Sequence, residues 1–176
     1  MVITKLELRN VKSYADTVMI DFARGVNAIS GPNGAGKSTL LEAIGFALFD
    51  SLPYKQDDFL RLGEKRGEVA VHFIDALDER EYILTRPLGG GTLCITDVET
   101  KRKLEEGKQD VIDWLKKHMG VEPSADLTAL FEDAIGVPQG LLTATFLENA
   151  PARKKKFDPL LQVDDYETVW YRLRDT

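Results

Sequence analysis

Residues 31 to 38 read Gly31-Pro32-Asn33-Gly34-Ala35-Gly36-Lys37-Ser38. This octapeptide fits the pattern GxxxxGK(S/T) at every fixed position. Its glycines allow the backbone to approach a polyphosphate closely and to turn several N–H groups toward it. The octapeptide therefore predicts a phosphate-binding loop, the P-loop of nucleotide-binding proteins.

The segments on both sides of the loop fit this interpretation. Residues 26–30 form a short, mostly apolar run, which we expect to be a buried strand. After the loop, apolar or small residues recur at helical spacing and predict a helix with one packed face, formed by Leu41, Ile44, Gly45 and Leu48. A strand before the loop and a helix after it are the context that a P-loop requires.

The motif predicts ATP and Mg²⁺ as the ligands of this loop. Lys37 is expected to reach the β- and γ-phosphates as a catalytic point charge, and the Ser38 hydroxyl is placed to ligate Mg²⁺. Thr39, the next residue on the helix, is expected near the α-phosphate. The other phosphate contacts belong to the loop backbone, at Asn33, Gly34, Ala35 and Gly36.

The rest of the chain alternates between strand and helix patterns. Apolar residues at every second position predict strands at residues 2–9, 18–22, 69–73, 82–85 and 92–96. The last three are separated by turn-forming residues, so we expect an antiparallel β-meander. Two helical segments follow, one ending at Gly120 and one with Ser124 as its N-cap.

The final stretch contains a basic run and then a last helix. The basic run comprises Arg153, Lys154, Lys155 and Lys156. The last helix carries an apolar seam at helical spacing, formed by Tyr166, Val169, Trp170 and Leu173. The basic run contacts DNA phosphates, forms a solvated helix face or contacts a neighbouring lobe, and the sequence leaves all three open.

Composition is ordinary for a globular protein. The chain has 176 residues, of which 43% are hydrophobic and 30% charged, enough for one domain with a core. Its net charge is -6. If the protein binds a nucleic acid, a local basic patch or another part of an assembly has to make the contact. No apolar run reaches the roughly 20 residues of a membrane span. With no signal peptide visible and a single cysteine, Cys94, we expect a cytoplasmic protein without membrane contact.

The sequence lacks recognisable motifs for the hydrolysis of ATP. Hydrolysis needs a Walker-B acid after an apolar strand, and no apolar run followed by an Asp-Glu pair occurs after residue 100. Glu132-Asp133 lies inside a helical pattern with the acids in reversed order, and Asp164-Asp165 follows polar sequence. No LSGG-type signature occurs. We therefore expect a nucleotide-binding half-site that hydrolyses ATP only when another lobe completes it.

The flanks of the P-loop resemble those of SMC-like ATPases. The opening strand and turn, residues 5–14, read KLELRNVKSY, and residues 136–140 read GVPQG, similar to the Q-loop of that family. Gln139 follows Lys37 by 102 residues, a spacing usual for the SbcC-type repair branch. Residues 146–148, 152–161 and 166–170 are similar to the passage of that branch into its coiled coil.

This resemblance implies an α/β fold of the P-loop NTPase class. Residues 1–165 would form the N-terminal lobe of an ABC-type ATPase head, with an antiparallel β-meander, and residues 166–176 the start of a coiled-coil helix. In such proteins a C-terminal lobe returns after the coiled coil, and two heads sandwich two ATP molecules.

The resemblance also assigns roles to residues outside the P-loop. Gln139 would complete the Mg²⁺ shell and sense the γ-phosphate, which makes it both a metal ligand and a catalytic residue. Lys12, where the family often has arginine, would contact phosphate. The segment before Gly63 would lie beside adenine and ribose, and it comprises Leu60, Arg61 and Leu62.

The function implied is DNA double-strand-break repair. ATP-driven dimerisation of two heads would regulate DNA end processing by an Mre/SbcD-type nuclease, acting on double-stranded DNA at the nucleoid of a prokaryote. One alternative is a chromosome-organising SMC ATPase. A transporter ATPase subunit is a second alternative, disfavoured by the spacing of 102 residues between Lys37 and Gln139 and by the coiled-coil-like tail.

Overall fold

The computed structural model describes residues 1–136, 148–161 and 163–174. The chain forms two compact units, Met1–Thr128 and Ala129–Thr176. Among the described helices, none is both long and apolar enough to cross a membrane.

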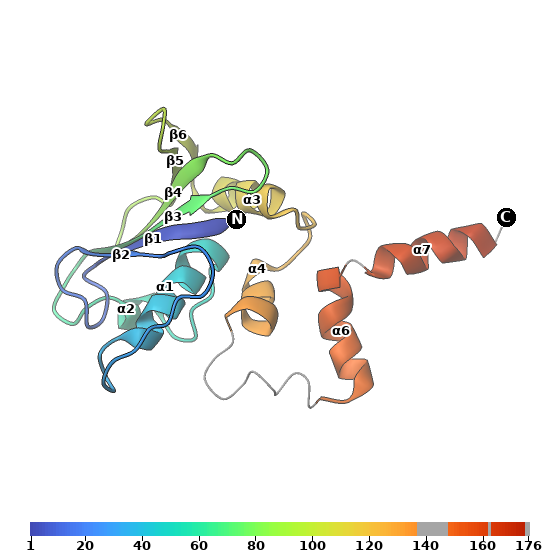
Figure 1. Ribbon diagram of the computed structural model, residues 1–176, viewed down its shortest axis with the longest axis horizontal. Helices are drawn as coiled ribbons and strands as arrows, with labels where there is room; N and C mark the ends of the chain where they lie inside the picture. Colours follow the sequence, from blue (N-terminus) through green and yellow to red (C-terminus); the bar gives the residue numbers. More distant parts are fainter. Residues whose placement is uncertain (137–147, 162, 175–176) are drawn as a thin grey trace. The chain divides into compact units, whose positions relative to one another are not determined.

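The first unit is built on a six-stranded sheet with the order β2-β1-β3-β4-β5-β6 (Figure 1). All neighbouring strands are antiparallel. The strands are β1 (Val2–Arg9), β2 (Val18–Asp21), β3 (Gly67–Ile74), β4 (Glu81–Leu88), β5 (Cys94–Asp97) and β6 (Lys103–Glu106). The predicted meander is confirmed. Strand β6 was not predicted, because its sequence KLEE has no apolar alternation.

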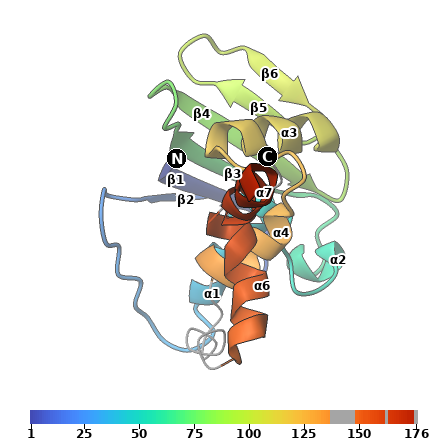
Figure 2. The ribbon, with the colours of Figure 1, turned by 90° about the vertical axis from the view of Figure 1, so that its right-hand side faces the viewer.

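One face of the sheet carries the core. The register places Leu6 opposite Val71, and Val71 opposite Leu84, so that buried apolar side chains form a row across three strands. Two helices cover this face, α1 (Lys37–Phe49) and α3 (Lys108–Met119) (Figure 2). A short helix, α2 (Gln56–Phe59), adds the fully buried ring of Phe59.

Helix α1 forms as predicted, and its buried face matches the predicted one in part, because Gly45 and Leu48 are buried but Leu41 is not. Leu41 is 41% exposed, whereas its neighbour Leu40 is buried together with Ala43 and Ala47. The pattern was ambiguous because almost every position between residues 40 and 49 is apolar or small. The sheet that receives the helix decides which stripe is buried, and helical spacing alone does not.

The prediction of a buried strand at residues 26–30 is wrong. These residues are exposed and belong to no strand, and Val26 is 99% exposed. A buried strand needs a neighbour for its backbone hydrogen bonds, and none of the described strands pairs with this segment. The local order that remains comes from Asn27, whose side chain donates to the Ala23 carbonyl and accepts from the Ala23 N–H.

An aromatic and hydrogen-bonded cluster fixes helix α3 to the sheet. The His118 Nδ1 lies 2.7 Å from the Oδ2 of Asp75, a buried residue that follows β3. The His118 ring stacks on Trp114 at a centroid distance of 3.6 Å, and Trp114 packs edge-on against Tyr82 of β4. Burial is the larger and the hydrogen bond to Asp78 the smaller of two effects that raise the pKa of Tyr82 to about 12. The Tyr82 hydroxyl is therefore protonated at neutral pH and donates to Asp78.

The helices of the second half begin at polar caps. Helix α4 (Leu127–Leu130) continues into a π-helical turn, η1 (Phe131–Ile135). The N-cap of α4 is Asp126, whose Oδ1 accepts a hydrogen bond from the Thr128 N–H. The predicted N-cap, Ser124, is therefore wrong, because the cap lies two residues later. Helix α6 (Ala150–Leu161) begins after Asn149, which caps the Ala152 N–H, and α7 is Val163–Arg174. The seam residues Tyr166, Val169, Trp170 and Leu173 are exposed.

The C-terminal end of α1 is held by an ionic cluster around Asp50. Asp50 is the C-cap of α1 in the left-handed conformation, with φ of 57°. Its carboxylate pairs with the Arg86 guanidinium of β4 and, at 2.6 Å, with the Lys108 ammonium at the start of α3. Arg86 is buried and its guanidinium stacks 4.9 Å from the centroid of Phe46. Three elements of the first unit therefore meet at one carboxylate.

This cluster predicts an acid-dependent stability. Burial favours the neutral acid, but hydrogen bonds and charges from Lys108 and Arg86 outweigh it and lower the pKa of Asp50 below 3.8. A lowered pKa stabilises the fold above the unfolded-state value, and this contribution is lost as pH falls through the folded-state value. We expect Asp50→Asn, which tolerates the same backbone conformation, to lower the free energy of unfolding at pH 7 by about 1–3 kcal/mol.

The measurement is chemical denaturation of both proteins between pH 7 and pH 3. The stability difference between wild type and Asp50→Asn should shrink as the pH falls below about 4. The exposed Asp16→Asn is the matched control and should change stability by less than about 0.5 kcal/mol. A difference that stays constant down to pH 3 would contradict the role of the Asp50 charge.

Candidate nucleotide-binding site

The P-loop lies directly before helix α1. Gly36 is the N-cap, with φ of 87°, no side chain caps this end, and the first turn contains no acidic residue. The loop residues 31–35 are exposed. The first N–H groups of a helix have no partner within the helix, and its dipole is positive at this end. The arrangement leaves these donors for an anionic ligand.

Lys37 folds back over the loop that precedes it. Its ammonium donates to the carbonyl oxygens of Gly31, at 2.9 Å, and Pro32, at 2.8 Å. The charge is thereby held at the mouth of the P-loop, although Lys37 belongs to the helix. Ser38 is exposed next to it, as a metal-ligating hydroxyl requires, whereas Thr39 is buried. Thr39 is therefore available to a phosphate only through its backbone or a change of rotamer.

Tyr14 fixes the position of Gly36. Its hydroxyl donates to the Gly36 carbonyl at 3.2 Å, and a Cβ built on Gly36 would lie 3.0 Å from the Tyr14 ring. Tyr14 is held by a tight turn, because its N–H and its carbonyl both bond to Val11. No role for Tyr14 was predicted from the sequence. It belongs to the opening motif, and only the structure brings that turn against the P-loop.

Lys12 lies on the same turn and is engaged within the chain. Its ammonium is 2.8 Å from the Oε2 of Glu42 on α1, and it lies 4.1 Å from the centroid of the Tyr54 ring. The Tyr54 hydroxyl donates to the same Glu42 oxygen at 2.6 Å. Lys12 therefore forms an ion pair within the chain, and its contact with phosphate stays a prediction. Glu42 and Tyr54 were not found from the sequence, because neither stands in a motif.

The segment predicted beside adenine and ribose lies against the turn of Lys12. The Arg61 N–H donates to the Asn10 carbonyl at 3.0 Å, and the Arg61 guanidinium donates to the Lys12 carbonyl at 2.9 Å. Leu60 forms a bridge with Val11, and the Leu62 side chain is fully exposed. Lys12 and residues 60–62 are thus brought together. Gln139 lies outside the described residues.

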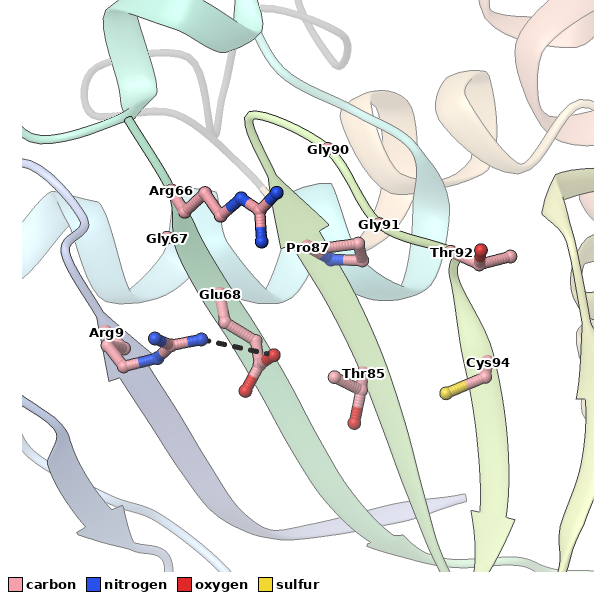
Figure 3. Close-up of a pocket in the computed structure, with 10 residues that line it drawn as sticks. All are labelled: Arg9, Arg66, Gly67, Glu68, Thr85, Pro87, Gly90, Gly91, Thr92 and Cys94. Carbon is pink, nitrogen blue, oxygen red and sulfur yellow. Dashed lines mark ion pairs between the residues drawn. The ribbon is translucent and has the colours of Figure 1, made fainter. Parts of the chain in front are cut away.

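A hollow on the opposite face of the sheet is separate from this site. It has a volume of about 320 Å³ and is lined by outward-facing side chains that include Arg9, Glu68 and Thr85 (Figure 3). Arg9 pairs with Glu68 at 3.6 Å. Burial raises the pKa of the Cys94 thiol at its edge, so the thiol stays protonated and unreactive. Because these residues alternate with the core residues, the hollow faces away from α1.

The P-loop residues fit ATP and Mg²⁺. The uncapped end of α1, the ammonium of Lys37 and the exposed Ser38 are the donors, cation and hydroxyl that a Mg²⁺-bound polyphosphate requires. Together with the antiparallel sheet that supports α1, they define the N-terminal lobe of an ABC-type ATPase head of the P-loop class.

Comparison with known proteins agrees with this class. A family model described as an AAA domain matches residues 5–165. The DNA double-strand break repair Rad50 ATPases of Thermoplasma volcanium and Thermococcus kodakarensis are both 32% identical, each over 99% of this chain and 19% of the relative. That of Archaeoglobus fulgidus is 26% identical over 98% of this chain and 18% of the relative. The chain thus spans about a fifth of the length of these relatives.

Solved structures agree at the level of the fold. One, described as "Structural biochemistry of ATP-driven dimerization and DNA stimulated activation of SMC ATPases", superposes with a TM-score of 0.65 at 25% identity, over 91% of this chain and 99% of that chain. The recombination mediator protein RecF with ATP has a TM-score of 0.50 at 24% identity, over 59% of this chain and 28% of that chain. The chain belongs to the AAA domain family, and its predicted place as an SMC-like N-terminal lobe of the Rad50 and SbcC type is confirmed.

The packing of Tyr14 on Gly36 predicts a large effect of a small substitution. Gly36→Ala adds a Cβ at a positive φ and within 3.0 Å of the Tyr14 ring. Gly25→Ala is the matched control, because Gly25 also has a positive φ of 94° but nothing within 4 Å. We expect Gly36→Ala to lower the free energy of unfolding by about 1–3 kcal/mol more than Gly25→Ala, since only Gly36→Ala displaces a packed ring. Equal losses in chemical denaturation would show that Tyr14 does not restrain the loop.

Proposed function

We propose that this chain is the ATP-binding N-terminal lobe of an SMC-like DNA-repair ATPase, in which ATP drives the dimerisation of two heads. The observation that carries the proposal is the P-loop at the uncapped end of α1, with the Lys37 ammonium held over it. The names of the Rad50 relatives support the assignment to double-strand break repair.

In the proposed complex, the loop backbone from Asn33 to Gly36 surrounds the phosphates and Lys37 neutralises them. Ser38 ligates Mg²⁺, and Gln139 completes the metal shell. Lys12 contacts phosphate after leaving its internal partner, and residues 60–62 border adenine and ribose. The contact of Arg61 with the Lys12 carbonyl supports this grouping, because it ties the two segments together before any ligand binds.

The proposal includes a C-terminal lobe that completes the ATPase. Val26 and Ile29 support it, because they are apolar residues in an exposed run next to the P-loop, where a buried strand was expected. A strand supplied by that lobe would cover them and give the backbone its hydrogen-bond partners. The lobe would also carry the Walker-B acid that this sequence does not contain.

The further partners proposed are a second head, double-stranded DNA and an Mre/SbcD-type nuclease. We place the assembly in the cytoplasm, at the nucleoid. Arg153 and Lys154 of the basic run are exposed on α6, which makes them candidates for phosphate contacts. Lys154 also lies 3.7 Å from Asp158 one turn later, so its charge is shared with an acid. The exposed seam of α7 suits the partner helix of a coiled coil.

The isolated chain is expected to bind ATP but to hydrolyse it at background rate. Hydrolysis requires a Walker-B acid, which this sequence does not contain, and often a charge supplied by another chain. Phosphate release should be measured for the chain alone and after mixing it with the separately produced C-terminal lobe of the same protein. Activity that appears only in the mixture supports the proposal, and robust turnover by the pure chain would contradict it.

Replacement of Lys37 tests the P-loop directly. We expect Lys37→Ala to weaken ATP binding by at least about tenfold, because charge-assisted contacts to phosphate are lost, and to abolish ATP-dependent dimerisation of reconstituted heads. Isothermal titration measures the first effect, and light scattering measures the second. Lys65→Ala, on an exposed loop of the same unit, is the matched control. Unchanged dimerisation of the Lys37 variant would remove the P-loop from the mechanism.

A further inference from the structure

Glu42 occupies a special position on helix α1. Its carboxylate is about one and a half turns beyond Lys37 on the same helix, and its side chain is 24% exposed. One oxygen, Oε2, accepts hydrogen bonds from both the Lys12 ammonium, at 2.8 Å, and the Tyr54 hydroxyl, at 2.6 Å. A single carboxylate oxygen on the P-loop helix therefore holds two side chains from outside that helix.

The surroundings of Lys12 hold its charge in this place. The ammonium lies over the Tyr54 ring at 4.1 Å and near the Phe59 ring at 5.7 Å. An ammonium over an aromatic face is attracted by the electron-rich face of the ring. The Lys12 side chain is only 30% exposed, so the ion pair is partly shielded from water. Burial and the hydrogen bond to Glu42 raise the pKa of Tyr54, so its hydroxyl remains a donor.

The two lysines of the candidate nucleotide site are thus both bound by the chain itself. Lys37 donates to two loop carbonyls, and Lys12 is paired with Glu42. The carbonyls are neutral, whereas Glu42 carries a full negative charge. A polyphosphate that recruits Lys12 must separate it from a carboxylate, while Lys37 exchanges only neutral acceptors.

We propose that Glu42 is a positioning residue that pairs with Lys12 and competes with the phosphates of ATP for its ammonium. Tyr54 supports Glu42 by orienting the shared oxygen, and its ring supports Lys12. The inference rests on the proposed function, because it concerns the same nucleotide site. Glu42 then sets the affinity of the lobe for ATP, since the energy of the internal ion pair is subtracted from that of binding.

The direct test is the affinity of the chain for ATP with Mg²⁺ after Glu42→Gln. Glutamine keeps the size of the side chain and an oxygen for Tyr54, but it loses the charge that holds Lys12. Partly exposed ion pairs of this kind contribute little, so we expect binding to become tighter by about fivefold. Isothermal titration at low ionic strength measures the change, and thermal unfolding checks that the variant is folded.

A double-mutant cycle separates competition for Lys12 from simple repulsion between Glu42 and the phosphates. Lys12→Met, Glu42→Gln and the double variant are compared with the wild type. If Glu42 acts through Lys12, Glu42→Gln should tighten binding by less than about twofold in the Lys12→Met background. Equal tightening in both backgrounds would overturn the proposal in favour of general repulsion.

Tyr54→Phe gives an independent variant that keeps the ring beneath Lys12. It removes only the hydroxyl that orients Glu42, so we expect ATP binding to tighten by about twofold. Unchanged or weaker binding in Glu42→Gln would overturn the proposal, whatever the result for Tyr54→Phe. The exposed Glu122→Gln is the charge-matched control and should leave the affinity within experimental error.

The outcome also distinguishes this inference from the proposed function. If the wild-type chain binds ATP, Lys37→Ala binds it at least about tenfold more weakly, and Glu42→Gln binds no more tightly than wild type, only the role of Glu42 fails. If ATP binding is absent or independent of Lys37, the proposed function fails, and the inference fails with it.

Discussion

The packing of helix α1 against the sheet is the interaction on which the candidate site depends. The P-loop has few contacts of its own, because residues 31–35 are exposed. Its position is fixed by the helix that follows, through buried residues such as Leu40 and Phe46. The far end of the same helix is held by Asp50, which pairs with Arg86 and Lys108. A helix secured along its length and at its C-terminus can present its N-terminal donors in one orientation.

The turn after β1 is the second element that determines the site. It brings Tyr14 against Gly36 and Lys12 against Glu42, so that it touches both the loop and the helix. Arg61 also contacts this turn, because its guanidinium donates a hydrogen bond to the Lys12 carbonyl. Residues separated by up to about fifty positions in sequence thereby surround one helix end. Such contacts depend on tertiary packing, and no local pattern in the sequence encodes them.

Much of the fold was predictable because its signals are local. The alternation in β1, β3 and β4 and the glycines of the P-loop each report a backbone requirement that a few neighbouring residues satisfy. Strand β6 was not predictable in this way, because Lys103 to Glu106 lie in a polar strand whose pairing with β5 supplies the order. The buried face of α1 also required the sheet, since Leu40 and Leu41 are equally apolar and only contact with the sheet distinguishes them.

The error at residues 26–30 has a different cause from these omissions. The pattern correctly identified an apolar segment next to the P-loop, but a pattern states what a segment prefers and not whether a neighbour is present. Backbone groups in a strand need partners on an adjacent strand, and the six strands of this sheet lie elsewhere. Because Val26 is exposed, the fold lacks the favourable free energy of burying this side chain. A strand from the proposed C-terminal lobe would supply it. The same reasoning applies to Lys12, whose charge is satisfied by Glu42 as long as no phosphate competes for it. In the proposed complex, Val26 and Lys12 would both exchange their present surroundings for the partners that the motifs predict.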